Sequence, residues 1–328
     1  MSLVRTPLVK FLSLFLLCAL LIFGTWQAFF RDKQPLILTD YSTFEKRLFL
    51  SIVNETTYGG YLMWIYGPRG DIKGLEITVD PPEPTDLFVQ VTNRTRNQGH
   101  SKLMIFLNGQ PVSFSVDSNP KQDYYSQQLP SLGMLNIPVE VDVSELQYAE
   151  NSITFLNLNC LDDKPSPKKP IQDLTVSRTK KLYVPAYTPG SALDQLTLTP
   201  TVEVTQAVAA NQEGIILIGL DGEIPERQQS QLSVAPGQSL SISVTAYDPN
   251  PVLYSTWIFL DDQPVWLDQE QPNLVWQSGS GQMLHQTITL PAQQGESTSL
   301  YVVSIPLKYP EQGYSVQASE RLLLLIQD

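Results

Sequence analysis

Apolar residues recur at every second position along much of this chain, which is the pattern of β-strands that bury one face. Leu87, Val89 and Val91 show this spacing, and residues 240–244 repeat it. A period of two places such residues on the same side of a strand. Long stretches of helical period are absent after residue 35, and proline is frequent, with 25 residues in the chain. The pattern therefore predicts an all-β protein.

An internal duplication appears when residues 87–112 are aligned without a gap on residues 240–265. Ten of the 26 aligned positions are identical, among them Phe106 with Phe259 and Pro111 with Pro264. Two further pairs of segments align at similar offsets: 61–72 with 214–224, and 137–143 with 286–292. Self-similarity at a fixed spacing indicates repeated structural units. We expect two copies of one domain.

Each copy contains a predicted hairpin. An apolar strand ends at Asn108-Gly109 in the first copy and at Asp261-Asp262 in the second. Two-residue turns of this kind need a positive φ at both positions, which Asn, Asp and Gly tolerate. The two turns are therefore expected at equivalent places in the two copies.

The second copy resembles a known type of module over about thirty residues. The run SVAPGQSLSISVTAYDPNPVLYSTWIF is similar to the strand B to strand C region of immunoglobulin-like and PKD-like domains, with a Pro-Gly turn, an alternating strand and an Asp-Pro loop. The resemblance implies that Trp257 is the core tryptophan of a β-sandwich. Neither copy has the cysteine pair of antibody domains, and Met104 replaces the tryptophan in the first copy.

These observations predict an all-β fold of two tandem immunoglobulin-like β-sandwiches preceded by one transmembrane helix. The expected segments are a cytoplasmic stub with the anchor helix (1–34), the first sandwich (35–184), a linker (185–194) and the second sandwich (195–328). The linker is rich in Pro and Gly, which break regular structure. Each sandwich is long enough to bury its own core.

The N-terminal run 11–30 contains twenty residues without a charge. At about 1.5 Å per residue, a helix of this length spans a bilayer's hydrocarbon core. A cleaved signal peptide would have a shorter apolar region and small residues at a cut site. A lipidated Cys18 would need small residues before it, whereas Phe15, Leu16 and Leu17 precede it. We therefore expect an uncleaved, single-pass anchor in the lipid bilayer.

Flanking charges are nearly balanced and do not fix the orientation of this anchor. By analogy with other anchored β-sandwich modules, the bulk of the chain is expected outside the cytoplasm. Asn54 and Asn93 begin N-glycosylation sequons, which would matter in a eukaryote.

Charge and composition narrow the function. The net charge of −12 repels phosphate backbones, so nucleic-acid binding is not expected. The chain has two cysteines, Cys18 and Cys160, and two histidines, His100 and His285. No phosphate loop, zinc-ligand spacing or nucleophile motif is present. We expect no catalytic residue, cofactor or metal site.

Aromatic residues outside the predicted core are the candidate contact residues. Trp266 and Trp276 lie in a loop-rich stretch of the second copy, and Tyr124 and Tyr125 lie in the comparable stretch of the first. Flat rings can anchor a protein partner or stack on sugars, although they can also cover a face of their own sheet.

Two functional hypotheses follow. The first is a non-enzymatic, membrane-anchored accessory subunit or scaffold that binds a protein partner in a cell-envelope or membrane assembly. The alternative is a carbohydrate-binding or adhesion module that uses the exposed aromatics. Co-purification with a membrane protein favours the first, and polysaccharide binding that is lost on tryptophan replacement favours the second.

Overall fold

The computed structural model describes residues 47–48, 61–67, 70–71, 76–79, 85–93, 98–131, 133–159, 175–203, 216–225, 230–235, 237–245, 251–265, 273–279, 282–289, 297–307, 317–319 and 321–327. Within these ranges the chain is all-β, as the sequence predicts, with several sheets and one short 3₁₀ helix, η2 (Ala192–Gln195). The predicted anchor and its cysteine, Cys18, lie outside the described residues.

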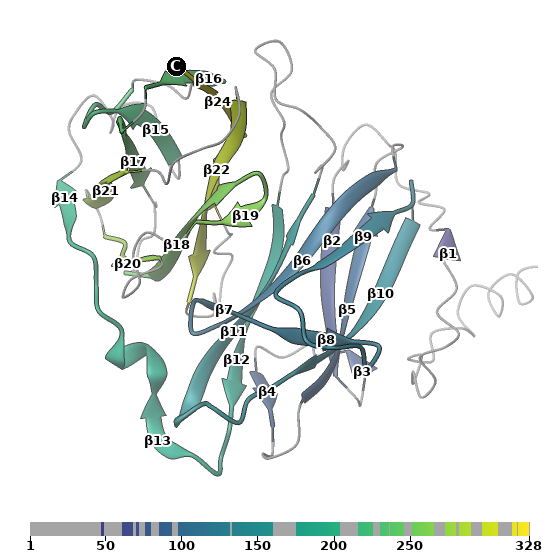
Figure 1. The fold of residues 1–328 in the computed structure, drawn as a ribbon. Coiled ribbons are helices and arrows are strands. Elements are labelled where there is room, and N and C mark those ends of the chain that lie inside the picture. The colour runs from purple at the N-terminus through teal and green to yellow at the C-terminus, as the bar shows by residue number, and fades with distance from the viewer. Residues whose placement is uncertain are drawn as a thin grey trace, which may run out of the picture. The chain divides into compact units, whose positions relative to one another are not determined.

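Two sheets form in the first half of the described chain (Figure 1). The strands of the first sheet are β1 (Arg47–Leu48), β2 (Tyr61–Gly67), β3 (Gly70–Asp71), β5 (Thr85–Asn93), β8 (Phe114–Val116) and β10 (Gly133–Val141). The strands of the second are β4 (Glu76–Thr78), β6 (Gly99–Leu107), β7 (Gln110–Val112), β9 (Tyr125–Leu129), β11 (Tyr148–Leu158), β12 (Thr175–Tyr183) and β13 (Thr188–Ser191). β5 lies between β10 and β2, and β11 lies between β12 and β6.

One apolar core lies between these two sheets. Leu87, Val89 and Val91 contribute to it from β5, and Leu103 and Ile105 contribute from β6. They occupy every second position of their strands, so alternation directs them to the same side. Two sheets with a shared core between them form a β-sandwich, which we call the first sandwich.

The second half of the described chain repeats this arrangement. The strands of the third sheet are β14 (Thr201–Glu203), β15 (Ile216–Leu220), β17 (Ser239–Thr245) and β21 (Gln282–Thr289). The strands of the fourth are β16 (Gln231–Val234), β18 (Leu253–Leu260), β19 (Gln263–Pro264), β20 (Leu274–Gln277), β22 (Ser297–Pro306), β23 (Gln317–Ala318) and β24 (Leu322–Ile326). A second apolar core draws on both sheets and defines the second sandwich.

Strand register confirms the internal duplication. Phe106 pairs with Pro111 in the first sandwich, and Phe259 pairs with Pro264 in the second. The turns also agree, because all four turn residues, Asn108, Gly109, Asp261 and Asp262, have positive φ. A two-residue turn with two positive φ angles matches the twist of a hairpin.

The duplication extends through both sheets of each sandwich. Leu87 pairs with Val139 across β5 and β10, just as Leu240 pairs with Ile288 across β17 and β21. Each sandwich also has a short leading strand on the edge of its first sheet: β1 beside β10, and β14 beside β21. In each sandwich one short strand pairs in parallel with a strand from the C-terminal part of that sandwich, β4 with β12 and β16 with β24.

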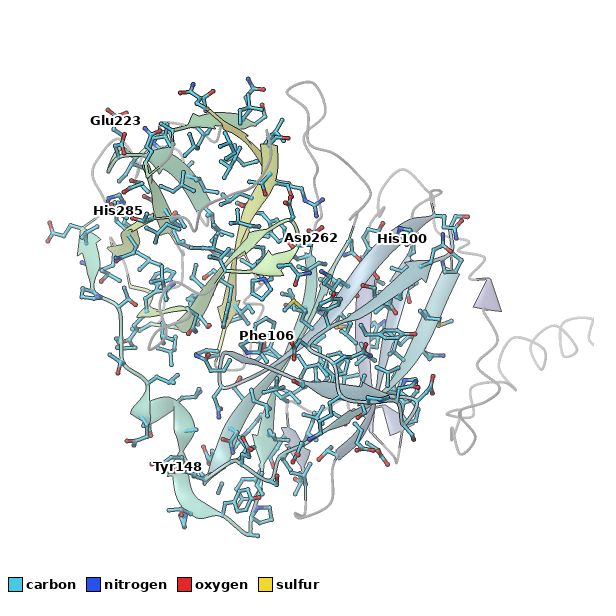
Figure 2. The ribbon with its side chains drawn as sticks, viewed as in Figure 1. His100, Phe106, Tyr148, Glu223, Asp262 and His285 are labelled. Atoms are coloured by element: carbon cyan, nitrogen blue, oxygen red, sulfur yellow. The ribbon has the colours of Figure 1, made fainter. Side chains whose placement is uncertain are left out.

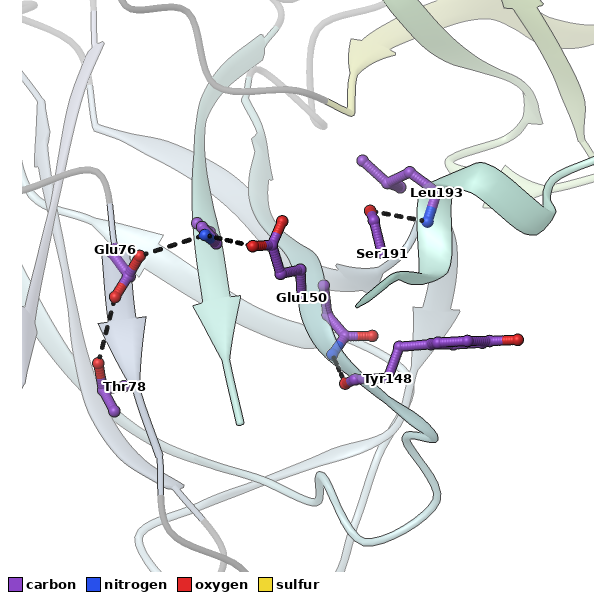
Figure 3. Close-up of polar contacts among 8 residues, drawn as sticks. Glu76, Thr78, Tyr148, Glu150, Ser191 and Leu193 are labelled. Carbon is purple, nitrogen blue, oxygen red and sulfur yellow. Dashed lines mark hydrogen bonds and ion pairs between the residues drawn. The ribbon is translucent and has the colours of Figure 1, made fainter. Parts of the chain in front are cut away.

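The segment predicted as a linker has structure of its own. Thr188–Ser191 forms β13, which pairs in parallel with β11 of the first sandwich. The η2 helix follows directly, and the Ser191 side chain caps it by accepting a hydrogen bond from the backbone N–H of Leu193 at 3.3 Å (Figure 3). The first part of the connection therefore belongs to the first sandwich.

Candidate functional site

A third apolar cluster joins the two sandwiches within the compact unit Asp40–Asp328. Its buried members come from β6 and β11 of the first sandwich and from β18 and β22 of the second: Met104, Phe106, Leu156, Leu158, Trp257, Phe259, Tyr301, Val303 and Ile305. Because the alternate residues of β6 and β18 fill the sandwich cores, these strands are buried on both faces. That double burial explains why Leu103–Leu107 and Trp257–Leu260 read as continuous apolar runs.

The cluster is built from equivalent faces of the two copies. Met104 aligns with Trp257 and Phe106 with Phe259, and all four side chains lie in the cluster. The strand register shows the same equivalence. Met104 on β6 pairs with Leu156 on β11, and Trp257 on β18 pairs with Val303 on β22. The contact is therefore close to isologous: one surface, present twice in the chain, packs on itself.

Aromatic rings fill the centre of this interface. Phe106 of the first sandwich is labelled in Figure 2. Its ring meets that of Trp257 from the second sandwich, with centroids 5.6 Å apart and planes tilted by 57°. On the second sandwich, Phe259 stacks on Tyr301 at 5.0 Å. Trp257 is fully buried. The prediction that it is the core tryptophan of its own sandwich is wrong, because its side chain points from β18 into the interface.

The polar contacts of the interface also come in related pairs. Ser255 Oγ donates to the carbonyl oxygen of Gly109 at 3.1 Å, and Lys102 Nζ donates to the carbonyl oxygen of Asp262 at 2.8 Å. Lys102 aligns with Ser255 and Gly109 with Asp262, so these bonds occupy equivalent places. The Gly109 carbonyl also accepts from Trp257 Nε1 at 3.0 Å. Satisfying these buried groups fixes the orientation in which the two faces meet.

Gly109 is where the first hairpin turn touches the second sandwich. Its φ is +81°, and an added Cβ would lie 2.9 Å from Ser255 Cβ and 3.1 Å from Leu307 Cδ2. Gly222 has a similar φ of +88°, and nothing lies within 4 Å of its added Cβ. The two glycines therefore share a backbone requirement and differ in the space around them.

We expect Gly109→Ala to destabilise the protein more than Gly222→Ala. Each variant loses about 1–2 kcal/mol to left-handed backbone strain, and crowding adds about 1–3 kcal/mol at Gly109 alone. Urea unfolding of both variants measures the difference. Equal losses would show that the turn does not press against the second sandwich.

A charged group lies at the rim of the interface. Arg321 Nη2 forms an ion pair with Asp262 Oδ1 at 2.7 Å, and its side chain is only 3% exposed. The guanidinium lies 5.3 Å from the Tyr301 ring centroid. Burial raises the pKa of the Tyr301 phenol well above its usual value and lowers the pKa of the Lys102 ammonium, an effect that the Asp262 charge partly offsets. The net gain from such a buried ion pair is smaller than its Coulomb attraction, because both charges lose hydration on burial.

Asp261, the first residue of the second turn, holds β22 through three hydrogen bonds. Its carboxylate accepts from the Thr298 hydroxyl at 2.7 Å and from the Ser299 backbone N–H and hydroxyl at 2.8 and 3.1 Å. Burial alone would raise the pKa of this carboxyl, but the hydrogen bonds and the charge of Arg321 outweigh it, so the pKa is lowered. The carboxylate form is therefore the one that stabilises the fold.

This depressed pKa predicts a pH dependence. Stability from Asp261 is present above its ordinary value of 3.8 and is lost as the pH falls through the lower folded-state value. We expect Asp261→Asn, which tolerates the same backbone, to lower Tm at pH 7, and the gap to wild type to narrow below about pH 4. Melting curves from pH 7 to pH 3 measure it. A constant gap would contradict the assignment.

The four aromatic candidates lie in different environments. Tyr124 is 36% exposed, and Lys102 Nζ lies 4.1 Å above its ring. Tyr125 is half-buried on β9 and packs against the core of the first sandwich. Trp266 lies outside the described residues. Of these candidates, Tyr124 is the one shown with a side chain open to a partner, at the rim of the interface.

Trp276 cannot be a surface contact residue, so that prediction is wrong. The side chain is fully buried in the core of the second sandwich, because β20 pairs with β18 and turns it inward. Its ring stacks on Tyr254 with centroids 5.3 Å apart, and Nε1 donates to the Thr256 hydroxyl at 2.9 Å. A sugar-stacking platform made of Trp266 and Trp276 is therefore excluded.

A small ion-pair network lies on the second sheet (Figure 3). Lys181 on β12 pairs with Glu150 on β11 at 3.1 Å and with Glu76 on β4 at 3.5 Å. The hydrogen bond that Lys181 Nζ donates to the Glu150 carboxylate is the main cause of the raised pKa of Lys181. The carboxylates are about half exposed, so the network contributes modestly to strand pairing.

The two histidines lie on different sheets, His100 on β6 and His285 on β21. His100 is exposed on β6, and His285 Nδ1 lies 2.9 Å from Ser243 Oγ on the neighbouring strand β17. Ser243 is only 2% exposed, which leaves its hydroxyl no access to a substrate. In the described part of the chain, no group of three or more His, Cys, Asp or Glu side chains is placed to hold a metal. Cys160 lies outside the described residues.

Two other sequence features have structural outcomes. Asn93 is fully buried and its amide donates to the carbonyl oxygen of Pro130 at 3.1 Å, so the folded protein has no room for a glycan there. Asn54 lies outside the described residues. Among the described residues no helix is long and apolar enough to cross a membrane, and the predicted span 11–30 lies outside them.

No family model and no curated protein matches this chain. Solved structures with partial similarity include red sea bream transglutaminase (10% identity, TM-score 0.23, covering 83% of this chain and 32% of that one) and the E. coli chaperone DraB (12%, 0.25, 81% and 97%). A third is CBD12 from CALX1.2 (10%, 0.21, 76% and 83%). The chain thus spans about a third of the transglutaminase. At these TM-scores the neighbours carry no argument about function.

Sequence reasoning missed three residues that matter here. The Asn-Gly sequence predicts the turn at Gly109 but not the contact of this turn with the second sandwich, because that contact joins segments distant in the sequence. The exposure of Trp64, 45% on β2, was signalled by the apolar positions on either side of it, Met63 and Ile65, which point into the core. Arg178, half-buried beside Trp64, has no such signal.

Proposed function

We propose that this chain is a non-enzymatic, membrane-anchored scaffold or accessory subunit that binds a protein partner in a cell-envelope assembly, with its bulk outside the cytoplasm. The interface between the sandwiches carries the proposal. Nine buried apolar side chains and a set of buried hydrogen bonds hold the two sandwiches as one body. A scaffold needs this property, because it must present its surfaces in a fixed relation.

We further infer that both sandwiches are immunoglobulin-like. In the first, β2, β5, β10 and β8 follow the order of strands A, B, E and D, and β6, β11 and β12 follow strands C, F and G. The second sandwich repeats the neighbours of β5 and β11 around β17 and β22. By analogy with other modules of this kind, we expect the two sandwiches to act through their surfaces.

A pull-down from membranes tests the proposed function. The full-length chain, solubilised in mild detergent after a carbonate wash, should remain with the membrane fraction and bring down a protein in near-stoichiometric amount. The matched control is residues 1–34 fused to an unrelated soluble domain, which keeps the anchor and removes both sandwiches. Recovery of the same protein by the control, or extraction of the full chain by carbonate, would contradict the proposal.

A further inference from the structure

Trp64 stands on the outer face of the first sheet beside two amide side chains. It is 45% exposed, whereas Met63 and Ile65 on either side of it are buried in the core. Across the sheet, Trp64 pairs with Gln90 on β5, and Gln90 pairs with Asn136 on β10. An indole and two amides therefore form one row across three adjacent strands.

Hydrogen bonds hold the amides of this row in place. Tyr66 Oη donates to Gln90 Oε1 at 3.4 Å, and Gln90 Nε2 donates to Asn136 Oδ1 at 2.8 Å. Gln90 Oε1 and Asn136 Oδ1 therefore both accept hydrogen bonds. Among the described residues, Asn136 Nδ2 donates to no acceptor. The row thus presents amide donors beside the ring, held in a fixed orientation before any ligand arrives.

Arg178 adds a positive charge to the same surface. Its guanidinium lies 5.8 Å from the centroid of the Trp64 ring and donates to the carbonyl oxygen of Ser177 at 3.1 Å. In the described part of the chain no carboxylate forms an ion pair with it, and burial lowers its pKa. A half-buried arginine beside a ring, without an acidic partner, is well suited to receive a carboxylate from outside.

We propose that Trp64, Gln90, Asn136 and Arg178 form a binding surface for an acidic polysaccharide, one that contains uronate-type sugars. The apolar C–H face of a pyranose stacks on the indole, its hydroxyls accept hydrogen bonds from the amides, and its carboxylate pairs with Arg178. A protein partner fits less well, because the centre of the row is made of amides rather than of the aromatic and aliphatic residues typical of interface cores. The surface does not depend on the scaffold function.

The net charge of −12 opposes a polyanionic ligand at long range, so binding at this surface has to come from specific contacts. Non-specific adsorption of an acidic polysaccharide is not expected. Specific contacts at Trp64 and Arg178 must then account for binding where it occurs. Loss of either side chain should have a clear effect.

Thermophoresis of the full-length chain in detergent, titrated with polygalacturonate and separately with neutral dextran, tests the surface. We expect binding of polygalacturonate, at least about fivefold weaker binding in Trp64→Ala, and about tenfold weaker binding in Arg178→Gln. Two matched controls, Tyr124→Ala and Lys121→Gln, remove an exposed ring and an exposed cation elsewhere, and both should bind as wild type does.

Each other outcome overturns the proposal. Absence of polygalacturonate binding, or equal binding by wild type and by both Trp64→Ala and Arg178→Gln, would show that this surface is not the site. If neutral dextran bound as tightly as polygalacturonate, a carboxylate on the sugar would not be needed, and the proposed pairing of that carboxylate with Arg178 would be wrong. Melting curves show whether each variant is folded. If Trp64→Ala does not fold, the comparison of Arg178→Gln with wild type still tests the surface. A partner protein whose capture in the pull-down is lost in Trp64→Ala would assign the surface to protein binding instead.

Discussion

Replacing Trp257 by Ala is expected to cost about 3–5 kcal/mol and to separate the unfolding of the two sandwiches. The fully buried ring contacts Phe106 across the interface, and its N–H bonds the Gly109 carbonyl. The substitution therefore removes a ring contact and a hydrogen bond between the sandwiches, while the separate core of each sandwich is unchanged. Calorimetry should show one transition in wild type and two in the variant.

Trp257→Phe separates ring packing from the hydrogen bond. Phe retains most of the apolar contact and leaves the Gly109 carbonyl without the indole donor, so an intermediate loss of about 1–2 kcal/mol is expected. If Trp257→Ala melted like wild type, the third apolar cluster would not hold the sandwiches together, and the scaffold proposal would lose its support.

Trp276→Ala is expected to have an effect of similar size in a different place. The buried indole stacks on Tyr254 and bonds Thr256, whose hydroxyl lies 2.8 Å from that of Ser304. Removing it leaves a cavity inside the second sandwich and costs about 3–5 kcal/mol. Urea unfolding, followed by tryptophan fluorescence and by circular dichroism, measures this loss.

Tyr124→Ala is the matched control for Trp276→Ala. It removes an exposed ring and one cation–π contact with Lys102, which together are worth about 1 kcal/mol or less. If Trp276→Ala lost as little unfolding free energy as Tyr124→Ala, the burial of Trp276 would be contradicted. The surface position that the sequence alone predicts for Trp276 would then be supported.

The two tryptophans show how far the sequence could lead. Alternation and self-similarity predict the strands, the hairpins and the duplication, because these depend on local spacing and local turn chemistry. The face of β18 on which Trp257 lies cannot be read from an apolar run that is buried on both sides. Trp276 follows Asp, Gln and Pro residues and resembles a loop residue, yet Leu274–Gln277 pairs with β18. Pairing between segments distant in sequence leaves no local signal.

Of the three candidate contact residues that the structure describes, Tyr124 is the one whose exposure matches the sequence-based expectation, and whether it contacts a partner stays a prediction. Exposure depends on what covers a residue in three dimensions, and composition reports this poorly for aromatics. Trp64 illustrates the converse, since its ring is exposed although its segment is apolar throughout, and the alternation with Met63 and Ile65, rather than composition, indicates its outer face.

The near-isologous interface has a consequence for how this chain associates. Two equivalent faces that meet within one chain behave as a tethered homodimer, in which the tether supplies an effective concentration on the order of millimolar for a short flexible connection. The same faces remain complementary between separate chains, so the connection that follows Ser191 decides which pairing prevails. Shortening it would strain the closed form and favour reciprocal exchange of sandwiches between two molecules. We therefore expect the length of the connection to decide between a self-contained monomer and an interlocked dimer.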